Sequence, residues 1–332
     1  MSLAEPQIAP AGASSPSAVV CRVENLSHRY DEKVVLGPDG GVSLDVSAGE
    51  IVTVLGPNGS GKTTLFRLLC TLLPIQSGRI SIGNGDAMID VAADPLAARG
   101  QIGIVFQSPS LDAKLTVIEN LQCQAALYGI RGAEFKRRAG EALGAMGLSD
   151  RQGDFCGKLS GGLKRRVEIA KTLLHRPRFL LLDEPSTGLD PAARLDLWAA
   201  VRRIANGGDA DHPAAVLMTT HLIDEADRSD RVVLMDAGQI VASGRPTDLR
   251  SSLGDSVITV QPSDAAAVRD ELAAMDLEVQ EASGDFRVAS DDPASLVARL
   301  IDRLGDAAQS ISVGRPTLED LFVRRTGRGL EP

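Results

Sequence analysis

The pattern of apolar and polar residues predicts strands that alternate with helices over most of the chain. Several short runs are almost wholly apolar, at residues 51–55, 101–106, 178–182, 214–219 and 231–235. Continuous apolar runs of this length are typical of parallel strands that are buried on both faces. Helical patterns lie between them, as at residues 192–205, so the sequence predicts an α/β core with a parallel sheet.

Two regions depart from this core pattern. Residues 19–23 and 42–46 alternate between apolar and polar positions ahead of the first buried strand, which predicts an antiparallel β layer beside the parallel sheet. Residues 115–158 are helical in pattern, and Thr116 followed by Glu119 has the spacing of a capping box. We therefore expect a helical insertion between two parts of the core.

A second, smaller unit is expected after a linking helix at residues 246–253. The predicted elements are strand, helix, strand, strand, helix and strand, at residues 256–261, 265–275, 277–282, 285–290, 293–305 and 309–314, with a last helix at 317–326. This order matches a ferredoxin-like βαββαβ unit. The predicted organisation is a disordered tail at 1–18, a large domain at 19–250, a small α+β domain at 251–326 and a tail at 327–332.

Composition narrows the possible functions. The 332 residues carry a net charge of -9, which argues against a dedicated nucleic-acid binder. The basic clusters at 136–138, 164–166 and 324–325 are expected on solvated helix faces. Four cysteines without C-x-x-C spacing predict reduced thiols, with Cys70 and Cys123 in the core. No apolar run reaches the 18 or so residues of a membrane-spanning helix, so a membrane role would need a partner.

The strongest chemical signal follows the apolar run at 51–55. Residues 56–64 read Gly-Pro-Asn-Gly-Ser-Gly-Lys-Thr-Thr and precede a helical segment, which is the strand, glycine-rich turn and helix of a P-loop. Glycines allow backbone N–H groups to approach an anion, and the helix N-terminus adds partial positive charge. The expected nucleotide-binding residues here are Gly56, Pro57, Asn58, Gly59, Ser60, Gly61, Lys62, Thr63 and Thr64.

A pair of carboxylates supplies the second signal. Asp183 and Glu184 follow the apolar strand at 179–182, and ligands of open α/β sheets bind at that end of a strand. Asp183 is suited to hold Mg²⁺, and Glu184 to act as general base on an attacking water. Between these motifs, Ser160, Gly161 and Gly162 precede a helix and form a candidate second anion site.

Taken in this order, the motifs resemble the nucleotide-binding subunit of an ATP-binding cassette (ABC) transporter over about residues 19–250. The resemblance implies the ABC ATPase fold, with a P-loop NTPase core, antiparallel β layer and helical insertion. It implies that Gln107 contacts Mg²⁺ and senses the γ-phosphate, that His221 positions this phosphate, and that Tyr30 stacks on adenine. It further implies that Ser160 to Gly162 contact ATP held by an opposite protomer.

The signature departs from the commonest family form, because Leu163 stands where Gln is usual and basic residues follow. Similar signatures mark drug-resistance and nodulation-type exporters of the ABC-2 class, as does the segment at 315–322. The resemblance then implies an ATP-hydrolysing subunit that uses ATP and Mg²⁺ and pairs with a second nucleotide-binding subunit as a homodimer. It also implies a separate transmembrane permease, with this protein bound to it at the cytoplasmic side of the membrane. A soluble ABC-type ATPase acting on ribosomes or DNA and a regulatory nucleotide-binding module remain the alternatives.

Overall fold

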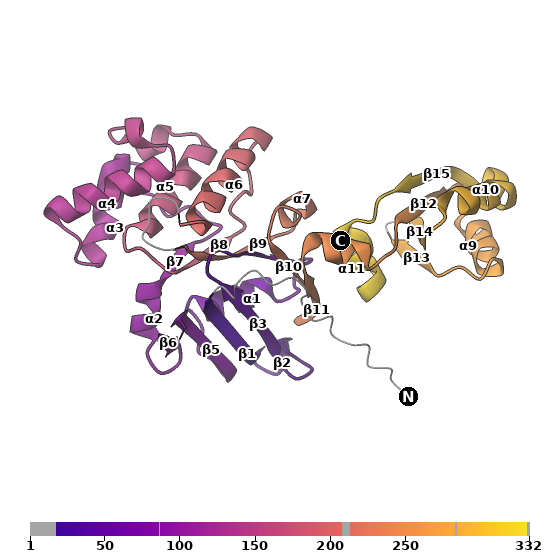
Figure 1. Cartoon of the computed structure of the whole chain (residues 1–332), viewed down its shortest axis with the longest axis horizontal. Coiled ribbons are helices and arrows are strands. Elements are labelled where there is room, and N and C mark those ends of the chain that lie inside the picture. The colour runs from indigo at the N-terminus through magenta and orange to yellow at the C-terminus, as the bar shows by residue number, and fades with distance from the viewer. Residues whose placement is uncertain (1–17, 86, 208–212, 283, 331–332) are drawn as a thin grey trace.

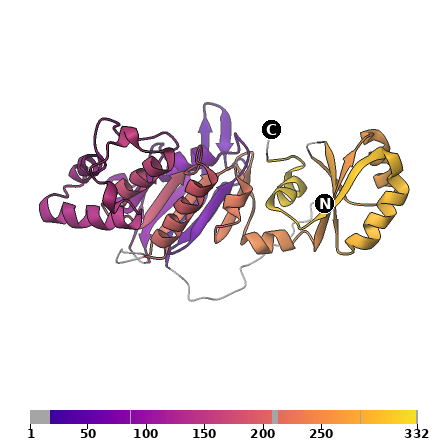
Figure 2. The same ribbon diagram turned by 90° about the horizontal axis from the view of Figure 1, so that it is seen from above.

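The computed structural model describes residues 18–85, 87–207, 213–282 and 284–330 (Figure 1). Residues 1–17, which are all of the predicted N-terminal tail except residue 18, lie outside these ranges, as do the last two residues of the chain. The molecule is elongated, with a helical region at one end, two sheets in the middle and a smaller α+β unit at the other end (Figures 1 and 2). In the described ranges, no helix combines the length and the apolar character needed to cross a membrane.

The predicted parallel sheet is present and has six strands in the order β11-β10-β4-β9-β8-β7. Neighbouring strands from β10 to β7 run parallel, and β11 pairs antiparallel with β10. The strands are β4 (Ile51–Leu55), β7 (Ile102–Val105), β8 (Phe179–Asp183), β9 (Ala215–Thr220), β10 (Arg231–Asp236) and β11 (Gln239–Gly244).

Side chains on the two faces of this sheet enter two different hydrophobic cores. In β8, Leu180 and Leu182 pack into one core, whereas Phe179 and Leu181 pack into the other. The first core is shared with four helices, and the second with the antiparallel sheet and α1 (Lys62–Leu69). Successive side chains of a strand point to opposite faces of the sheet, so a strand that is buried on both faces has a continuous apolar run in its sequence.

The antiparallel layer is also present, as a five-stranded sheet in which β3 pairs with β1 beside the order β2-β1-β5-β6. Its strands are β1 (Val19–Tyr30), β2 (Lys33–Leu36), β3 (Val42–Ser47), β5 (Ser77–Asn84) and β6 (Ala87–Asp90). Strands β2 and β6 and helix α2 (Pro95–Gln101) were not predicted from the sequence. These elements have four to seven residues, too few to show a clear period.

The helical region forms the other layer on the parallel sheet (Figure 1). It contains α3 (Val117–Leu127), α4 (Gly132–Ala145), α5 (Gly161–Leu173) and α6 (Pro191–Ala205), with the short turns η1 (Ser149–Arg151) and η2 (Cys156–Lys158). The predicted capping box is confirmed: the Thr116 hydroxyl accepts from the Glu119 N–H, and the Glu119 carboxylate accepts from the Thr116 N–H at 2.8 Å.

The four cysteines are free thiols, and the predicted burial was wrong for one of them, Cys123. Cys70 is buried, and burial raises the pKa of its thiol to about 11, so it stays protonated near neutral pH. Cys123 was expected in the core but is exposed on α3. An apolar stripe repeats only every three or four residues along a helix, and Cys123 falls outside the buried set that includes Leu121 and Ala125.

The C-terminal part contains a four-stranded antiparallel sheet in the order β13-β14-β12-β15, the strand order of a βαββαβ ferredoxin-like unit. Helices α9 and α10 share one hydrophobic core with this sheet. The elements after β11 are α8 (Pro246–Ser251), β12 (Ser256–Pro262), α9 (Ala265–Ala274), β13 (Val279–Ala282), β14 (Asp285–Ser290), α10 (Pro293–Leu304), η3 (Gly305–Ala307), β15 (Ala308–Gly314) and α11 (Leu318–Thr326).

The last helix, α11, connects this unit to the parallel sheet. Leu321 and Phe322 pack in one core with Leu55 of β4 and Leu234 of β10. Helix α11 also forms an ion pair with β14, because the Arg287 guanidinium lies 2.8 Å from the Asp320 carboxylate. A helix expected to complete the small unit therefore contacts both units.

Replacing Phe322 by Ala should destabilise the protein by about 3–5 kcal/mol, because it empties a fully buried site. The measurement is a urea unfolding series on the full chain. Ile301→Ala on α10 is the matched control, because Ile301 is 60% exposed and its truncation should change stability by less than about 0.5 kcal/mol. Equal unfolding midpoints for the two variants would contradict the role assigned to α11.

Candidate functional site

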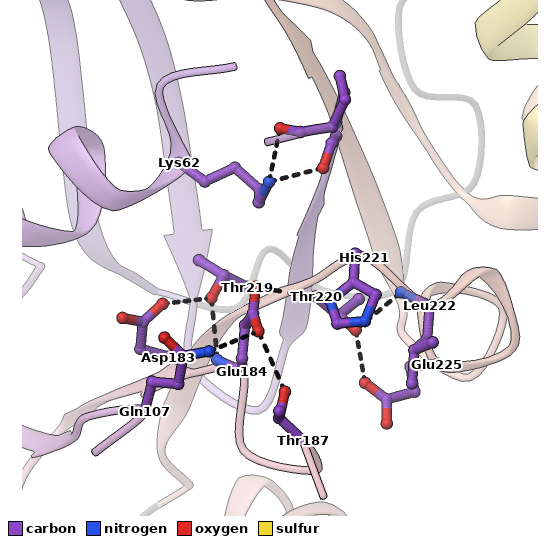
Figure 3. Close-up of polar contacts among 12 residues, drawn as sticks. Lys62, Gln107, Asp183, Glu184, Thr187, Thr219, Thr220, His221, Leu222 and Glu225 are labelled. Atoms are coloured by element: carbon purple, nitrogen blue, oxygen red, sulfur yellow. Dashed lines mark hydrogen bonds and ion pairs between the residues drawn. The ribbon is translucent and has the colours of Figure 1, made fainter. Parts of the chain in front are cut away.

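Most of the expected functional residues follow the carboxyl ends of neighbouring parallel strands. The P-loop follows β4, His221 follows β9, Asp183 ends β8 and Gln107 lies two residues after β7. Because these strands are adjacent and run in one direction, their carboxyl ends lie at one edge of the sheet. Figure 3 shows Lys62, Gln107, Asp183, Glu184 and His221 gathered at this edge.

The P-loop backbone requires glycine at defined positions. A Cβ at Gly56 would lie 2.2 Å from the Met235 carbonyl oxygen, so the chain can pass β10 only without a side chain there. Gly59 and Gly61 have φ of 80° and 102°, in the region that other residues avoid. Gly61 is the N-cap of α1, which places the positive end of this helix at the loop.

Lys62 is buried and folds over the loop, as Figure 3 shows. Its ammonium donates to the carbonyl oxygens of Gly56 at 2.6 Å and Pro57 at 2.9 Å. Burial lowers the pKa of this ammonium, and the carboxylates of Glu184 and Asp183 raise it in part. The charges of the P-loop lysine and of the carboxylate pair therefore act on each other across the site.

Glu184 is the centre of the polar contacts at this edge. Its carboxylate accepts hydrogen bonds from the Gln107 amide at 3.1 Å and the Thr187 hydroxyl at 3.0 Å. His221 Nδ1 lies 3.5 Å from the other carboxylate oxygen. Glu184 has a positive φ of 42°, which is uncommon for a residue with a side chain. The tertiary contacts must hold this backbone conformation, and such strain is frequent at functional sites.

Thr219 connects the two carboxylate residues and was not identified from the sequence. Its hydroxyl donates to the Asp183 carboxylate at 2.7 Å and accepts from the Glu184 N–H at 3.0 Å. Thr219 belongs to β9, next to β8, in register with Asp183. The hydroxyl at the polar end of an apolar strand was a signal in the sequence, but only the strand order assigns it to this pair.

His221 is held by a second threonine. The Thr220 hydroxyl donates to the Glu225 carboxylate at 2.7 Å and accepts from the Leu222 N–H at 3.0 Å (Figure 3). Glu225, in α7 (Ile223–Ala226), is buried. These bonds join the residues on either side of His221, so they fix the turn that presents the imidazole. Neither Thr220 nor Glu225 was predicted from the sequence as a residue of the site.

The Ser-Gly-Gly segment lies away from the P-loop of the same chain. Ser160 is the N-cap of α5, and its hydroxyl accepts from the Leu163 N–H at 3.4 Å. Helix α5 lies in the helical region, whereas α1 lies beside the strands in the middle of the molecule (Figure 1). Within the described ranges, no hydrogen bond or ion pair links Ser160 to residues 56–64. The fold therefore does not unite Ser160, Gly161 and Gly162 with the other site residues.

The basic cluster after this segment does not lie wholly on a solvated face, as the sequence analysis expected. Arg165 is buried, with 7% of its side chain exposed, and pairs with buried Glu168 at 3.0 Å. Its guanidinium also donates to the carbonyl of Phe106, the residue before Gln107, and to the carbonyl of Glu184. A lysine- and arginine-rich run predicts a solvent-exposed face, because charged side chains are rarely buried without a partner. Only the tertiary structure shows the acceptors that allow Arg165 to be buried.

Tyr30 ends β1 and is 39% exposed. Its ring makes an edge-to-face contact with His28, with ring centroids 4.9 Å apart. The ring lies at the end of a hairpin whose second strand, β2, approaches Gly61 through the Val35 carbonyl.

The donor set at this edge fits a metal-bound nucleotide. Thr63 is exposed in the first turn of α1, and its hydroxyl, the Gln107 amide and the Asp183 carboxylate offer the oxygen ligands that Mg²⁺ prefers. The glycine-rich loop and the N-terminus of α1 offer N–H groups suited to phosphate oxygens.

Gly56→Ala should abolish ATP binding, because the added methyl group cannot be accommodated against the Met235 backbone. The measurement is titration with a fluorescent ATP analogue, together with the thermal unfolding midpoint. Gly100→Ala is the matched control: a Cβ at Gly100 meets nothing within 4 Å, so binding should be unchanged. Normal ATP affinity in the Gly56 variant would contradict the steric requirement.

Comparison with known proteins agrees with this geometry. A family model described as ABC transporter matches residues 40–187. The chain is 34% identical to the daunorubicin resistance ATP-binding protein DrrA3 of Streptomyces coeruleorubidus, over 92% of this chain and 95% of that protein. It is 36% identical to the Nod factor export ATP-binding protein I of Burkholderia orbicola (strain AU 1054), over 92% of this chain and 97% of the relative.

Solved structures give the same fold. An ATP-binding subunit of an ABC transporter matches with a TM-score of 0.59 and 31% identity, covering 70% of this chain and 92% of that one. A bacterial Atm1-family ABC exporter with ATP bound matches with a TM-score of 0.58 and 26% identity, covering 72% of this chain and 41% of that one. The predicted ABC ATPase fold is confirmed. The chain belongs to the ABC transporter family, as an ATP-binding subunit that hydrolyses ATP.

Proposed function

We propose that this protein binds and hydrolyses ATP to drive export through a separate permease of the ABC-2 class. The observation that carries the proposal is the convergence of Gln107, His221 and Thr187 on the carboxylate of Glu184, beside the P-loop. A carboxylate held by several polar groups near a phosphate-binding loop is suited to activate water against the γ-phosphate.

Each residue then has a distinct role in hydrolysis. Glu184 accepts a proton from the attacking water, and Gln107 and His221 orient the reacting groups. Lys62 moves from the carbonyls of Gly56 and Pro57 to the phosphates, where its charge stabilises the transferring γ-phosphoryl group. Backbone N–H groups of residues 56–64 bind the phosphates, and Tyr30 stacks on the adenine.

Thr63, Gln107 and Asp183 would hold Mg²⁺. The ion supplies positive charge to the β- and γ-phosphates when bound. The bond from Thr219 to Asp183 keeps this carboxylate oriented at the end of β8.

The separation of the Ser-Gly-Gly segment from the P-loop supports a head-to-tail dimer. Ser160, Gly161 and Gly162 lie at a helix N-terminus, where N–H groups and the helix dipole favour an anion. In a homodimer, each N-terminus of α5 would face the γ-phosphate held by the partner copy.

The names of the similar proteins support export as the transport direction. They include two resistance proteins, for daunorubicin and linearmycin, and a Nod factor export protein, each described as ATP-binding. We therefore expect the chain to act with a membrane partner, at the cytoplasmic side of the membrane.

Glu184→Gln should leave ATP binding intact and lower the turnover rate by a factor of about 10²–10⁴, because the amide cannot accept the proton from water. ATP binding and steady-state phosphate release measure the two effects. Glu271→Gln, at a half-buried residue of α9 that pairs with Arg303 in the C-terminal unit, should change neither. Unchanged turnover in the Glu184 variant would reject this residue as the base.

ATPase activity should rise more than linearly with protein concentration, because each site needs the N-terminus of α5 from a second copy. Phosphate release across a dilution series, with sedimentation of the same samples in ATP, provides the test. Full specific activity in samples that sediment as monomers would contradict the shared site.

A further inference from the structure

Helix α5 makes a set of buried polar contacts that none of the roles above uses. Arg165 and Glu168 are spaced i, i+3 on this helix, and both are buried. Their side chains contact the backbone segments at the sheet edge that carry Gln107 and Glu184.

Arg165 holds the backbone of the carboxylate segment. Its Nε donates to the Pro185 carbonyl at 2.8 Å, and Nη2 donates to the carbonyl of Asp183 at 2.9 Å and, at 3.4 Å, to that of Glu184. Three successive carbonyl oxygens can converge on one guanidinium only when the backbone between them turns sharply. The positive φ of Glu184 provides this turn.

The same guanidinium holds the segment that carries Gln107. Its Nη1 donates to the carbonyl of Phe106, the residue immediately before Gln107, at 2.5 Å. Glu168 adds to this contact, because its carboxylate accepts from the Ser110 N–H as well as from Arg165. Lys171, one turn further, donates to the Ser110 carbonyl at 2.9 Å. One side of α5 therefore fixes the loop at 106–110 and the end of β8 relative to each other.

We infer that Arg165 is a positioning residue for ATP hydrolysis, which sets the separation of Gln107 and Glu184. This inference rests on the proposed function, in which these two residues act on the attacking water. The Gln107 amide reaches the Glu184 carboxylate at 3.1 Å, and both side chains leave backbone segments that the guanidinium joins. Because Ser160 begins the same helix, Arg165 also fixes the distance from these residues to the segment proposed to serve the partner's ATP.

Arginine suits this position for a chemical reason. The guanidinium has five N–H donors in one rigid plane and stays charged, so it can bond several carbonyls and a carboxylate at once. A lysine ammonium has three donors around one point and cannot span the same acceptors. Arg165→Lys thus keeps the buried charge beside Glu168 but loses the simultaneous contacts with the two segments.

The test compares Arg165→Lys with Arg166→Lys in the full chain. Arg166 is the neighbouring residue on α5, and its guanidinium contacts the Met146 carbonyl instead of the site. We expect Arg165→Lys to lower kcat about 10–100-fold, the size of effect that a displacement of about 1 Å can cause, and to leave the dissociation constant of ATP unchanged. Arg166→Lys should change neither.

A double substitution distinguishes positioning from a general loss of structure. If Arg165 acts through Glu184, adding Arg165→Lys to Glu184→Gln should cause no further loss of single-turnover rate. Three outcomes would overturn the inference. The first is a single-turnover rate in the double variant that is lower than in Glu184→Gln by the full factor seen for Arg165→Lys alone. The others are a wild-type kcat in Arg165→Lys, and a loss of ATP binding in Arg165→Lys together with the loss of kcat. Should Arg165→Lys fail to fold, Glu168→Gln replaces it in all three measurements, with a smaller decrease in kcat expected and the same overturning outcomes.

The two levels of the proposal fail differently. Wild-type turnover in Glu184→Gln would reject the base itself and hence the proposed function of this carboxylate. Lost turnover in Glu184→Gln with normal turnover in Arg165→Lys would reject only the role of Arg165.

Discussion

The parallel pairing of β4, β9, β8 and β7 is the constraint on which the site depends. Four segments that are distant in sequence end at one edge because their strands are adjacent and point the same way. Each strand in this row is held by hydrophobic cores on its two faces, so a one-residue shift of register would exchange side chains between the two cores and disrupt the packing of both. The apolar packing thereby sets the relative positions of Lys62, His221, Glu184 and Gln107.

A buried ion pair, Arg165 and Glu168, holds the helical region against the sheet edge. Arg165 and Glu168 would be costly to bury alone, since an ion moved from water into a protein interior loses its hydration. Here the pair is surrounded by backbone acceptors and a donor, and these contacts join the helical region to the sheet edge. The strained backbone at Glu184 is part of the same arrangement, because its N–H bonds Thr219 while its carbonyl faces Arg165.

The C-terminal part of the chain contacts the same sheet through α11 and the residues that follow it. Leu55, the last residue of β4 before the P-loop, shares a core with Phe322 of α11. Asp236, at the end of β10, pairs with Arg328 just beyond α11. The turn after β10 also contacts the P-loop, because the Gly238 N–H donates to the Ser60 carbonyl at 3.0 Å. The end of β10 and its turn therefore link the C-terminal segment to the nucleotide-binding loop.

The sequence alone determined the features that depend on local chemistry. Continuous apolar runs located the parallel strands, the glycines located the P-loop, and the Thr116 capping box located the start of α3, because each depends on residues close together in the chain. The order of motifs also identified the family. Short elements such as β2 and β6 carried too little pattern to be recognised.

Only the tertiary structure decided which polar groups meet. The same Lys164-Arg-Arg166 run that suggests a solvated face contains a buried Arg165, and a threonine ending an apolar strand becomes the partner of Asp183. Cys123 lies outside the core, and α11 contacts two units. Burial and hydrogen-bond partners of these residues depend on strand order and helix packing between distant segments, and local sequence does not specify those contacts.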